Sequence, residues 1–383
     1  MRNFTKSSKY HGDIQTRDIP DQDDGPGLLG LAIEMYKNLP FFSIRAFLIA
    51  LPSFLLISCE PSSAAQREDG KVNLQQADST LTHAEIAPSV IDTQVYNKLM
   101  LQLALNIDSS LWPVPCPLPS YGALLPFHRI VAYYGNLYST RMGILGELPA
   151  PEMLERLQGE VKKWQDADTT IKVLPALHYI AVTAQRDPGK AKKYRLRMPD
   201  AQIDKVLEMA ARINALVFLD IQVGHSTLQD EIPLLRNYLL MPNVHLGIDP
   251  EYAMHGTTVP GDRVGTFDAE DINYASDYLS TLVQENHLPP KVLVVHRFKK
   301  GMVTNYKEIK TYPDVQIVMN MDGFGSRGKK LTTYKYSITN EPVQFAGFKI
   351  FYKNDIADPA WVNIMQPAEV LSLYPVPVYI QYQ

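Results

Sequence analysis

Cysteine is scarce in this chain of 383 residues, which contains only Cys59 and Cys116. The two residues lie in unlike surroundings, so a disulfide framework is not expected. The spacings CxxC and HExxH, which mark strong zinc signatures, are also missing, and neither a metal site nor a cofactor is predicted. The net charge of −4 comes without a basic field or an acidic tail. This charge balance argues against a nucleic-acid-binding protein.

The first part of the chain lacks the patterns of a folded domain. Residues 1–34 are polar and have no helical or strand period, which predicts disorder. Because Met35 directly precedes a signal-like segment, we also expect that translation starts there and that residues 1–34 are not translated. Residues 60–90 are rich in Ser, Ala, Gln and Asp and are predicted to form a flexible linker.

Residues 35–59 have the pattern of a signal peptide. Lys37 and Arg45 supply positive charge, and the apolar stretch that follows is too short to span a membrane comfortably. The stretch ends in LISC at Cys59, which resembles a bacterial lipobox. This resemblance implies cleavage before Cys59, lipidation of its thiol, and an exported lipoprotein anchored to the lipid bilayer of the cell envelope, with the membrane face left open. An uncleaved N-terminal anchor is the alternative.

Apolar runs rich in Val, Ile and Leu alternate with amphipathic helical patterns in residues 91–383, which is typical of a parallel sheet covered by helices. Eight such runs in about 255 residues predict an α/β fold of the (β/α)8 TIM-type barrel. An open doubly wound sheet is the alternative, but the Gly-rich turn that often marks it is absent. The expected strands are Arg129–Gly135, Ile171–His178, Leu216–Gln222, a short run from Val244, Lys291–His296, Val315–Asp322, Ala346–Tyr352 and Val376–Tyr382.

Two helices bear on how this barrel is completed. Asp268 is expected to be the N-cap of the helix that follows the fourth strand. No helical pattern follows the eighth strand, where the sequence ends. The helix at Val95–Leu103 is therefore expected to cover part of the barrel in place of an eighth helix.

Polar or ionisable residues end nearly every expected strand, and active sites of such barrels lie at the carboxyl ends of the strands. Asp249 and Glu251 are two residues apart, so on a strand they would share a face. If both face inward, their repulsion raises one pKa. Alternatively, Asp249 caps the next turn or pairs with Lys349, or the strand ends form a polar plug without a catalytic role.

The candidate site residues follow from these strand ends. Those with a catalytic role are Glu251, Asp249, Asp220 and Asp322, and those for substrate binding are Tyr134, Asn136, His178, Gln222, His296 and Lys349. The aromatic residues that could stack on sugar rings, or simply fill the core, are Tyr133, Tyr134, Tyr138, Tyr252 and Trp361. A metal site built from His178, Asp220, His225 or His296 is a rival hypothesis, although their spacing in the sequence is long.

Several segments also resemble a family of bacterial lipoproteins, most of them uncharacterised, over residues 127–383. They include RIVAYYGN, LVFLDIQ, LGIDPEY, LVVHRF, MDGFG, GFKIFY and PAEVLSLYPVPVYIQYQ. The resemblance implies an exported barrel. A looser likeness is to glycoside hydrolase barrels, including chitinase-like ones, in which an acid ends the fourth strand and Glu251 is the matching position. The longer acidic repeat of chitinase-like enzymes is missing, since Leu246, Gly247 and Ile248 come before Asp249.

Together these features predict a two-carboxylate hydrolase that acts on envelope or extracellular carbohydrate. Glu251 would be the general acid, and Asp249, Asp220 or Asp322 the nucleophile or base. A non-catalytic glycan-binding or structural lipoprotein and a metal-dependent hydrolase remain the alternatives.

Overall fold

The computed structural model describes residues 91–105, 110–357 and 362–383. The expected extension 1–34, the signal peptide 35–59 with Cys59, and the linker 60–90 lie outside these residues, as does Trp361. No helix in the described part of the chain is long and apolar enough to cross a membrane.

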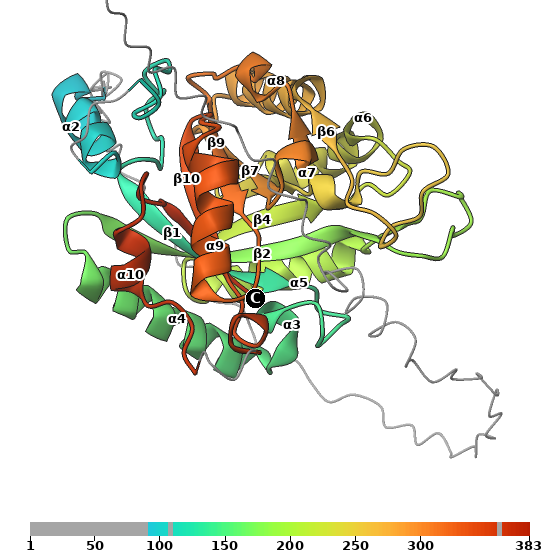
Figure 1. Cartoon of the computed structure of the whole chain (residues 1–383). Helices are drawn as coiled ribbons and strands as arrows, with labels where there is room; N and C mark the ends of the chain where they lie inside the picture. Colours follow the sequence, from blue (N-terminus) through green and yellow to red (C-terminus); the bar gives the residue numbers. More distant parts are fainter. Residues whose placement is uncertain (1–90, 106–109, 358–361) are drawn as a thin grey trace, which may run out of the picture. The chain divides into compact units, whose positions relative to one another are not determined.

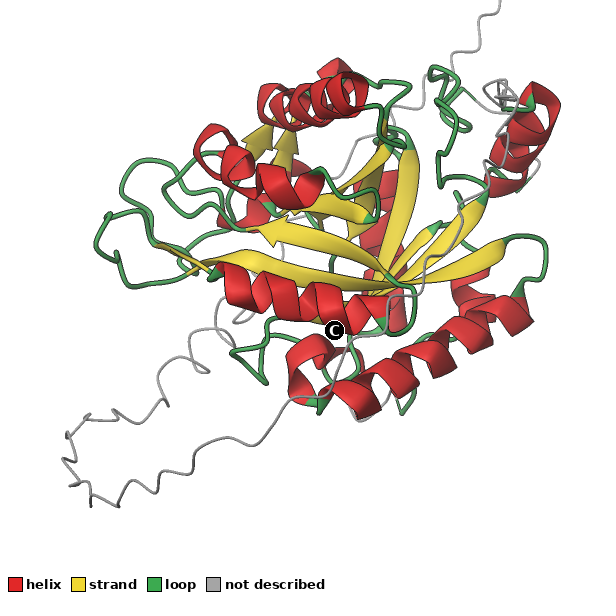
Figure 2. Cartoon of the chain, turned by 180° about the vertical axis from the view of Figure 1, so that it is seen from behind, coloured by secondary structure: helices red, strands yellow, loops and turns green. Residues whose placement is uncertain are grey.

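Eight parallel strands form a closed barrel, which confirms the predicted fold class (Figures 1 and 2). Each strand pairs in parallel with the next, and β1 closes the barrel by pairing with both β2 and β11. Most strands are buried along their whole length, because helices cover their outer faces and side chains fill the interior. The strands are β1 (His128–Gly135), β2 (Lys172–Ala184), β4 (Leu216–Ile221), β5 (Val244–Ile248), β7 (Lys291–Arg297), β9 (Val315–Met321), β10 (Phe345–Ile350) and β11 (Tyr379–Tyr382).

The outer helices follow the strands in chain order. Apolar side chains recur on one face of the long helices, and these faces pack on the strands. The helices are α3 (Ile144–Glu147), α4 (Ala150–Ala167), α5 (Asp200–Ala211), α6 (Leu228–Glu231), α7 (Arg236–Leu239), α8 (Ala269–Asn286), α9 (Arg327–Tyr334) and α10 (Pro367–Leu371). Asp268 caps α8 as expected and forms a capping box with Asp271.

Helix α2 (Thr93–Leu103) packs against the barrel rather than standing free. Its buried residues Tyr96 and Met100 belong to the same apolar cluster as the inward-facing Ile130 of β1 and Phe345 of β10. The backbone N–H of Val376 also donates to the Leu103 carbonyl at 2.7 Å. These contacts lie near the amino ends of the strands, so α2 covers the end of the barrel opposite the strand ends that carry the polar residues.

The structure differs from the expected elements in several places. Strand β2 continues past His178 to Ala184, where it pairs in antiparallel fashion with the short β3 (Arg195–Arg197). After β4, the apolar helical pattern around Ile232 forms no single helix but α6, a 3₁₀ turn (Ile232–Leu235) that contains Pro233, and α7. Helix α9 and the π-helical turn Lys335–Thr339 were not expected, because their sequence is largely polar and shows little apolar period. A small separate sheet pairs β6 (Phe267–Asp268) with β8 (Val303–Thr304).

Candidate functional site

A ring of polar side chains fills the barrel near the carboxyl ends of its strands. Tyr134, Asp220, His296 and Lys349 come from β1, β4, β7 and β10, which are alternate strands, as in the side-chain layers of a TIM barrel. All four are buried. The Tyr134 hydroxyl donates to Asp220 Oδ2 at 3.0 Å, and Lys349 Nζ lies 3.8 Å from the centre of the Tyr134 ring. Lys349 therefore points inward, a direction that the sequence left open.

His178 on β2 lies beside this ring and is fully buried. Its Nδ1 lies 2.6 Å from the Tyr379 hydroxyl, and its imidazole stacks on Phe218 with ring centres 5.2 Å apart. Its Nε2 lies 3.3 Å from Asp220 Oδ1. Neighbouring Gly247 leaves room for this contact, because a Cβ there would lie 2.4 Å from both atoms.

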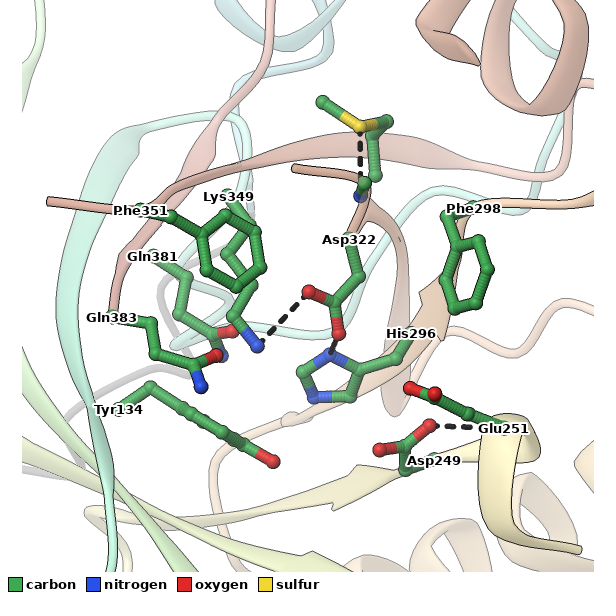
Figure 3. Close-up of polar contacts among 12 residues, drawn as sticks. Tyr134, Asp249, Glu251, His296, Phe298, Asp322, Lys349, Phe351, Gln381 and Gln383 are labelled. Atoms are coloured by element: carbon green, nitrogen blue, oxygen red, sulfur yellow. Dashed lines mark hydrogen bonds and ion pairs between the residues drawn. The ribbon is translucent and has the colours of Figure 1, made fainter. Parts of the chain in front are cut away.

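Asp322 follows β9 and joins two cationic partners at the mouth of the barrel (Figure 3). Its Oδ2 lies 2.8 Å from His296 Nδ1, and its Oδ1 lies 2.9 Å from Lys349 Nζ. Lys349 therefore pairs with Asp322, and the alternative of a pair with Asp249 does not hold.

Asp249 and Glu251 do not share the face of a strand, so that expectation was wrong. Strand β5 ends at Ile248, and Pro250 opens a 3₁₀ turn, Pro250–Tyr252, that contains Glu251. Asp249 caps this turn by accepting the Glu251 N–H at 3.0 Å. Even so, both side chains reach the mouth of the barrel, on the side of His296 (Figure 3). Asp249 is buried, whereas Glu251 is only partly buried.

These two acids hold their protons unusually tightly. Burial, together with the nearby Asp220 and Asp322, raises the pKa of Asp249 to about 7. Burial and the charges of Asp249 and Asp322 hold the pKa of Glu251 well above its usual range. Near neutral pH, Asp249 is therefore close to half-protonated, and Glu251 holds its proton to a higher pH than an ordinary glutamic acid.

The other two acids are ionised under the same conditions. Burial alone would raise the pKa of Asp220, but the charge of His296 and the nearby imidazole of His178 lower it. Burial is likewise outweighed at Asp322, where Lys349 and His296 lower the pKa. Carboxyl groups of opposite protonation thus meet in one site, an arrangement that suits a proton donor paired with an ionised carboxylate.

The two buried histidines also differ in their protonation. Burial opposes the charged form of His296, but Asp220 and Asp322 overcome it and raise its pKa to about 10. Burial lowers the pKa of His178 to about 4, so His178 is neutral near pH 7.

The remaining predicted residues have the following places. Gln222 Nε2 lies 3.4 Å from both the Tyr134 hydroxyl and Asp249 Oδ2, so it links the two residues. The Asn136 amide is engaged by backbone, since Nδ2 donates to the Ile180 carbonyl at 2.9 Å and Oδ1 accepts the Tyr138 N–H at 2.8 Å. These contacts give Asn136 a structural role in the loop after β1.

Two further predicted residues lie apart from the polar ring. Tyr133 has the opposite parity to Tyr134 and packs between barrel and helix, where its hydroxyl lies 3.0 Å from that of Tyr352. His225 does not join the other histidines: its Nε2 lies 2.6 Å from the Thr258 carbonyl and its ring packs on Tyr194.

Some residues at the mouth were missed by the sequence analysis. Phe298 and Phe351 flank Asp322 and His296, and Gln383 lies near Tyr134 (Figure 3). The sequence could have indicated Phe351, because it lies two residues after the candidate Lys349. Tyr379, which contacts His178, lies two residues before Gln381 in the same way. Such spacing places residues on one face of a strand.

A surface groove with a volume of about 330 Å³ lies elsewhere, near the amino ends of β1 and β2. Its lining includes Leu99, Leu371, Arg129 and Asp168, and the last two form an ion pair at 2.9 Å. Because Arg129 and Asp168 pair with each other, this groove is a weaker candidate for a catalytic or charged-ligand site than the strand ends are.

No family model matches this chain, and none of the curated proteins compared with it does. Among solved structures, the chain is similar to dihydropteroate synthase from Burkholderia cenocepacia in complex with 7,8-dihydropteroate. The identity is 11%, the TM-score is 0.29, and the match covers 70% of this chain and 91% of the other. The chain is also similar to Cel5A from Thermotoga maritima in complex with cellobiose. The identity is 8%, the TM-score is 0.33, and the match covers 67% of this chain and 88% of the other. At these values neither protein's activity carries over to this chain.

Proposed function

We propose that this protein hydrolyses carbohydrate at the mouth of the barrel, with Glu251 as general acid and Asp322 as nucleophile or base. The observation that carries the proposal is the placement of both acids in one site (Figure 3), where burial raises the pKa of Glu251 while Lys349 and His296 lower that of Asp322. Glycoside hydrolysis needs one carboxyl group to protonate the leaving oxygen and an ionised one to attack the sugar or activate water. Asp322 fits the ionised role better than Asp220, which is fully buried, or Asp249, which is only about half-ionised near neutral pH.

The surroundings of the two acids also suit a sugar substrate. Phe298 and Tyr252 are partly exposed. Phe298 lies beside His296 (Figure 3), and Tyr252 follows Glu251 directly in the sequence. Aromatic faces of this kind stack on sugar rings. Lys349 offers a cation that stabilises the charge of Asp322 during the reaction. These features support a carbohydrate ligand.

We further propose that the protein is an exported lipoprotein, attached to a bilayer of the cell envelope through lipidated Cys59. The LISC sequence at the end of the apolar segment supports this. Such an anchor would place the barrel beside envelope polysaccharides, so these and extracellular glycans are the proposed substrates.

The test is the release of reducing ends by the full chain, purified in detergent, from a panel of peptidoglycan and envelope polysaccharides. Glu251→Gln is expected to reduce release at least 100-fold, because proton donation by a positioned acid contributes roughly 10²–10⁴-fold. Glu285→Gln on the exposed face of α8 is the matched control and should retain full activity.

Two results would contradict the proposal. A folded wild-type protein that releases nothing from any glycan but binds one of them would favour a non-catalytic glycan-binding lipoprotein. Release that survives both Glu251→Gln and Asp322→Asn would place the catalytic groups elsewhere.

A further inference from the structure

Three ligand-type atoms converge inside the barrel without hydrogen-bond partners. His178 Nε2, Asp220 Oδ1 and His296 Nε2 lie within 4.8 Å of one another, and all three side chains are fully buried. None of these atoms has a hydrogen-bond partner within the described part of the chain. A buried polar atom without a hydrogen bond costs free energy, so each such atom needs an explanation. Three such atoms that face one another indicate a common cause.

We propose that His178, Asp220 and His296 bind a divalent transition-metal ion of the zinc class. Together with His225, these three residues made up the rival metal-site hypothesis of the sequence analysis, and the structure brings the three together while His225 lies apart. The inference rests on the barrel interior and does not depend on the proposed carbohydrate hydrolysis.

The distances fit metal ligands better than hydrogen bonds. Asp220 Oδ1 lies 3.3 Å from His178 Nε2 and 3.5 Å from His296 Nε2. Hydrogen bonds between nitrogen and oxygen are shorter, at about 2.7–3.2 Å. Ligands bonded at about 2.0–2.1 Å to a tetrahedral ion are separated from one another by roughly 3.3–3.4 Å. The separations of Asp220 Oδ1 from the two nitrogens therefore match two edges of such a tetrahedron, and the two nitrogens lie within 4.8 Å of each other, which is wider than a tetrahedral edge if they lie at that limit.

The opposite side of each ligand is fixed by a second residue. His178 Nδ1 lies 2.6 Å from the Tyr379 hydroxyl, and His296 Nδ1 lies 2.8 Å from Asp322 Oδ2. The Tyr134 hydroxyl donates to Asp220 Oδ2 at 3.0 Å, which leaves Oδ1 for the ion. Metal-binding imidazoles commonly bond through their other nitrogen to a carboxylate or another oxygen, which orients the ring.

Gly247 lets two of the ligand atoms approach the strand beside them. A Cβ at this position would lie 2.4 Å from both Asp220 Oδ1 and His178 Nε2, which is too short for any real contact of such a carbon. Every other residue type would therefore displace these two atoms. The glycine thus allows the two ligands to converge.

The ligand set indicates the class of ion. Two imidazole nitrogens and one carboxylate oxygen suit zinc, cobalt and iron, whereas magnesium and calcium prefer oxygen ligands alone. Three protein ligands leave a fourth position of a zinc-type ion for water or substrate. A proton is the rival occupant of the same place, because an imidazolium at His296 would also neutralise Asp220.

The experiment measures metal directly and does not use activity. The full chain in detergent is stripped with a chelator, incubated with Zn²⁺ or Co²⁺, freed of unbound ion and measured by mass spectrometry for metal content. Visible absorption of the Co²⁺ form reports the geometry, since tetrahedral Co²⁺ absorbs much more strongly than octahedral Co²⁺. A stoichiometric ion with strong visible bands is expected.

Variants locate the ion. Asp220→Asn weakens a ligand, and Gly247→Ala keeps every ligand residue but displaces two of the ligand atoms, so both should lose the ion. Their matched controls are His245→Gln, another buried histidine of the barrel interior, and Gly347→Ala, whose Cβ would meet Asn320 rather than the ligands. Both controls should retain it. Circular dichroism and cooperative thermal unfolding identify variants that fold, and His296→Gln replaces Gly247→Ala if the latter does not.

Two results would overturn the inference. The first is a folded wild-type chain that retains no Zn²⁺ or Co²⁺, which would leave the proton as occupant. The second is metal that persists in folded Asp220→Asn and in folded Gly247→Ala or His296→Gln, which would place the ion elsewhere in the chain. Neither result would bear on the test of Glu251.

Discussion

At the scale of single residues, the site depends on how neighbours change one chemical group. Asp249, Asp220 and Asp322 are the same residue type and are all buried, yet Asp249 is close to half-protonated near pH 7 while the other two are ionised. The difference lies in their partners. Asp220 lies beside His296, and Asp322 pairs with Lys349. The hydrogen-bond partners of Asp249 are neutral, namely the backbone N–H of Glu251 and the side-chain amide of Gln222. Burial then decides the outcome for Asp249.

The raised pKa of Asp249 makes the stability of the protein depend on pH. The pKa rises from roughly 3.9 in an unfolded chain to about 7 in the fold. Its stabilising contribution is therefore full below about pH 4 and is lost as the pH rises through about 7. Asp249→Asn cannot titrate, so we expect denaturant unfolding to show a flatter dependence between pH 4 and 7, by an amount on the order of a few kcal/mol.

The control for this prediction is Asp166→Asn, which changes an exposed acid paired with Lys162. It should leave the slope of stability against pH as in the wild type. Equal slopes in wild type and Asp249→Asn would show that Asp249 titrates normally.

At the scale of elements, the end of each strand decides where a side chain is presented. Pro250 cannot donate to the sheet, so β5 ends and the chain turns at once. The turn carries Glu251 to the mouth without placing it on the strand. Asp268 also lies where a strand ends, because it closes β6 and is the N-cap of α8. Its carboxylate accepts a hydrogen bond from Thr304 Oγ1 of β8 at 2.6 Å, which links β6 to β8.

Asp268 provides a prediction at this scale. Its carboxylate accepts the Glu270 N–H at 3.2 Å, and removal of a helix cap costs about 0.5–2 kcal/mol. Asp268→Ala is expected to lower the free energy of unfolding by about 1–2 kcal/mol, at the upper part of that range because the bond from Thr304 is lost as well. Asp268→Asn should retain most of the cap. Chemical denaturation that found equal loss in both variants would show that capping is not the cause.

The sequence predicts the barrel well because its signal is local. Each strand is an apolar run, and the two-residue period indicates which side chains share a face. The extension of β2 escapes such reasoning, because it depends on pairing with Arg195–Arg197. Helix α9 escapes it too, since it buries Lys330 and Tyr334 rather than an apolar stripe.

The site is predictable only in part, for the same reason. Strand ends indicate that Tyr134, Asp220, His296 and Lys349 lie at one end of the barrel. Which of them touch depends on barrel closure and on small residues such as Gly247, whose role becomes visible only beside His178 and Asp220. Pairings between strands, such as Lys349 on β10 with Asp322 after β9, therefore could not be read from the sequence.

At the scale of the whole molecule, we propose a barrel tethered to a membrane by one lipidated residue. The proposal predicts that Cys59 carries the lipid. Because the chain contains only two cysteines, Cys116 serves as the control. When the full-length gene is expressed in a bacterium fed a palmitate analogue, Cys59→Ser should lose the label and leave the membrane fraction. Cys116→Ser changes a partly buried thiol that lies 3.3 Å from the Tyr96 hydroxyl and should keep the label. Label that remained in Cys59→Ser would contradict the proposed anchor.

The central claim is that Glu251 carries a proton at neutral pH while Asp322 does not. Infrared difference spectroscopy of the full chain at pH 7 tests it without knowledge of the substrate, since a protonated carboxyl group has a carbonyl band distinct from those of a carboxylate. The wild-type spectrum minus that of Glu251→Gln is expected to contain this protonated band, and the wild-type spectrum minus that of Asp322→Asn is expected to contain carboxylate bands instead. A Glu251 difference made of carboxylate bands would contradict the account, because an ionised Glu251 has no proton to give.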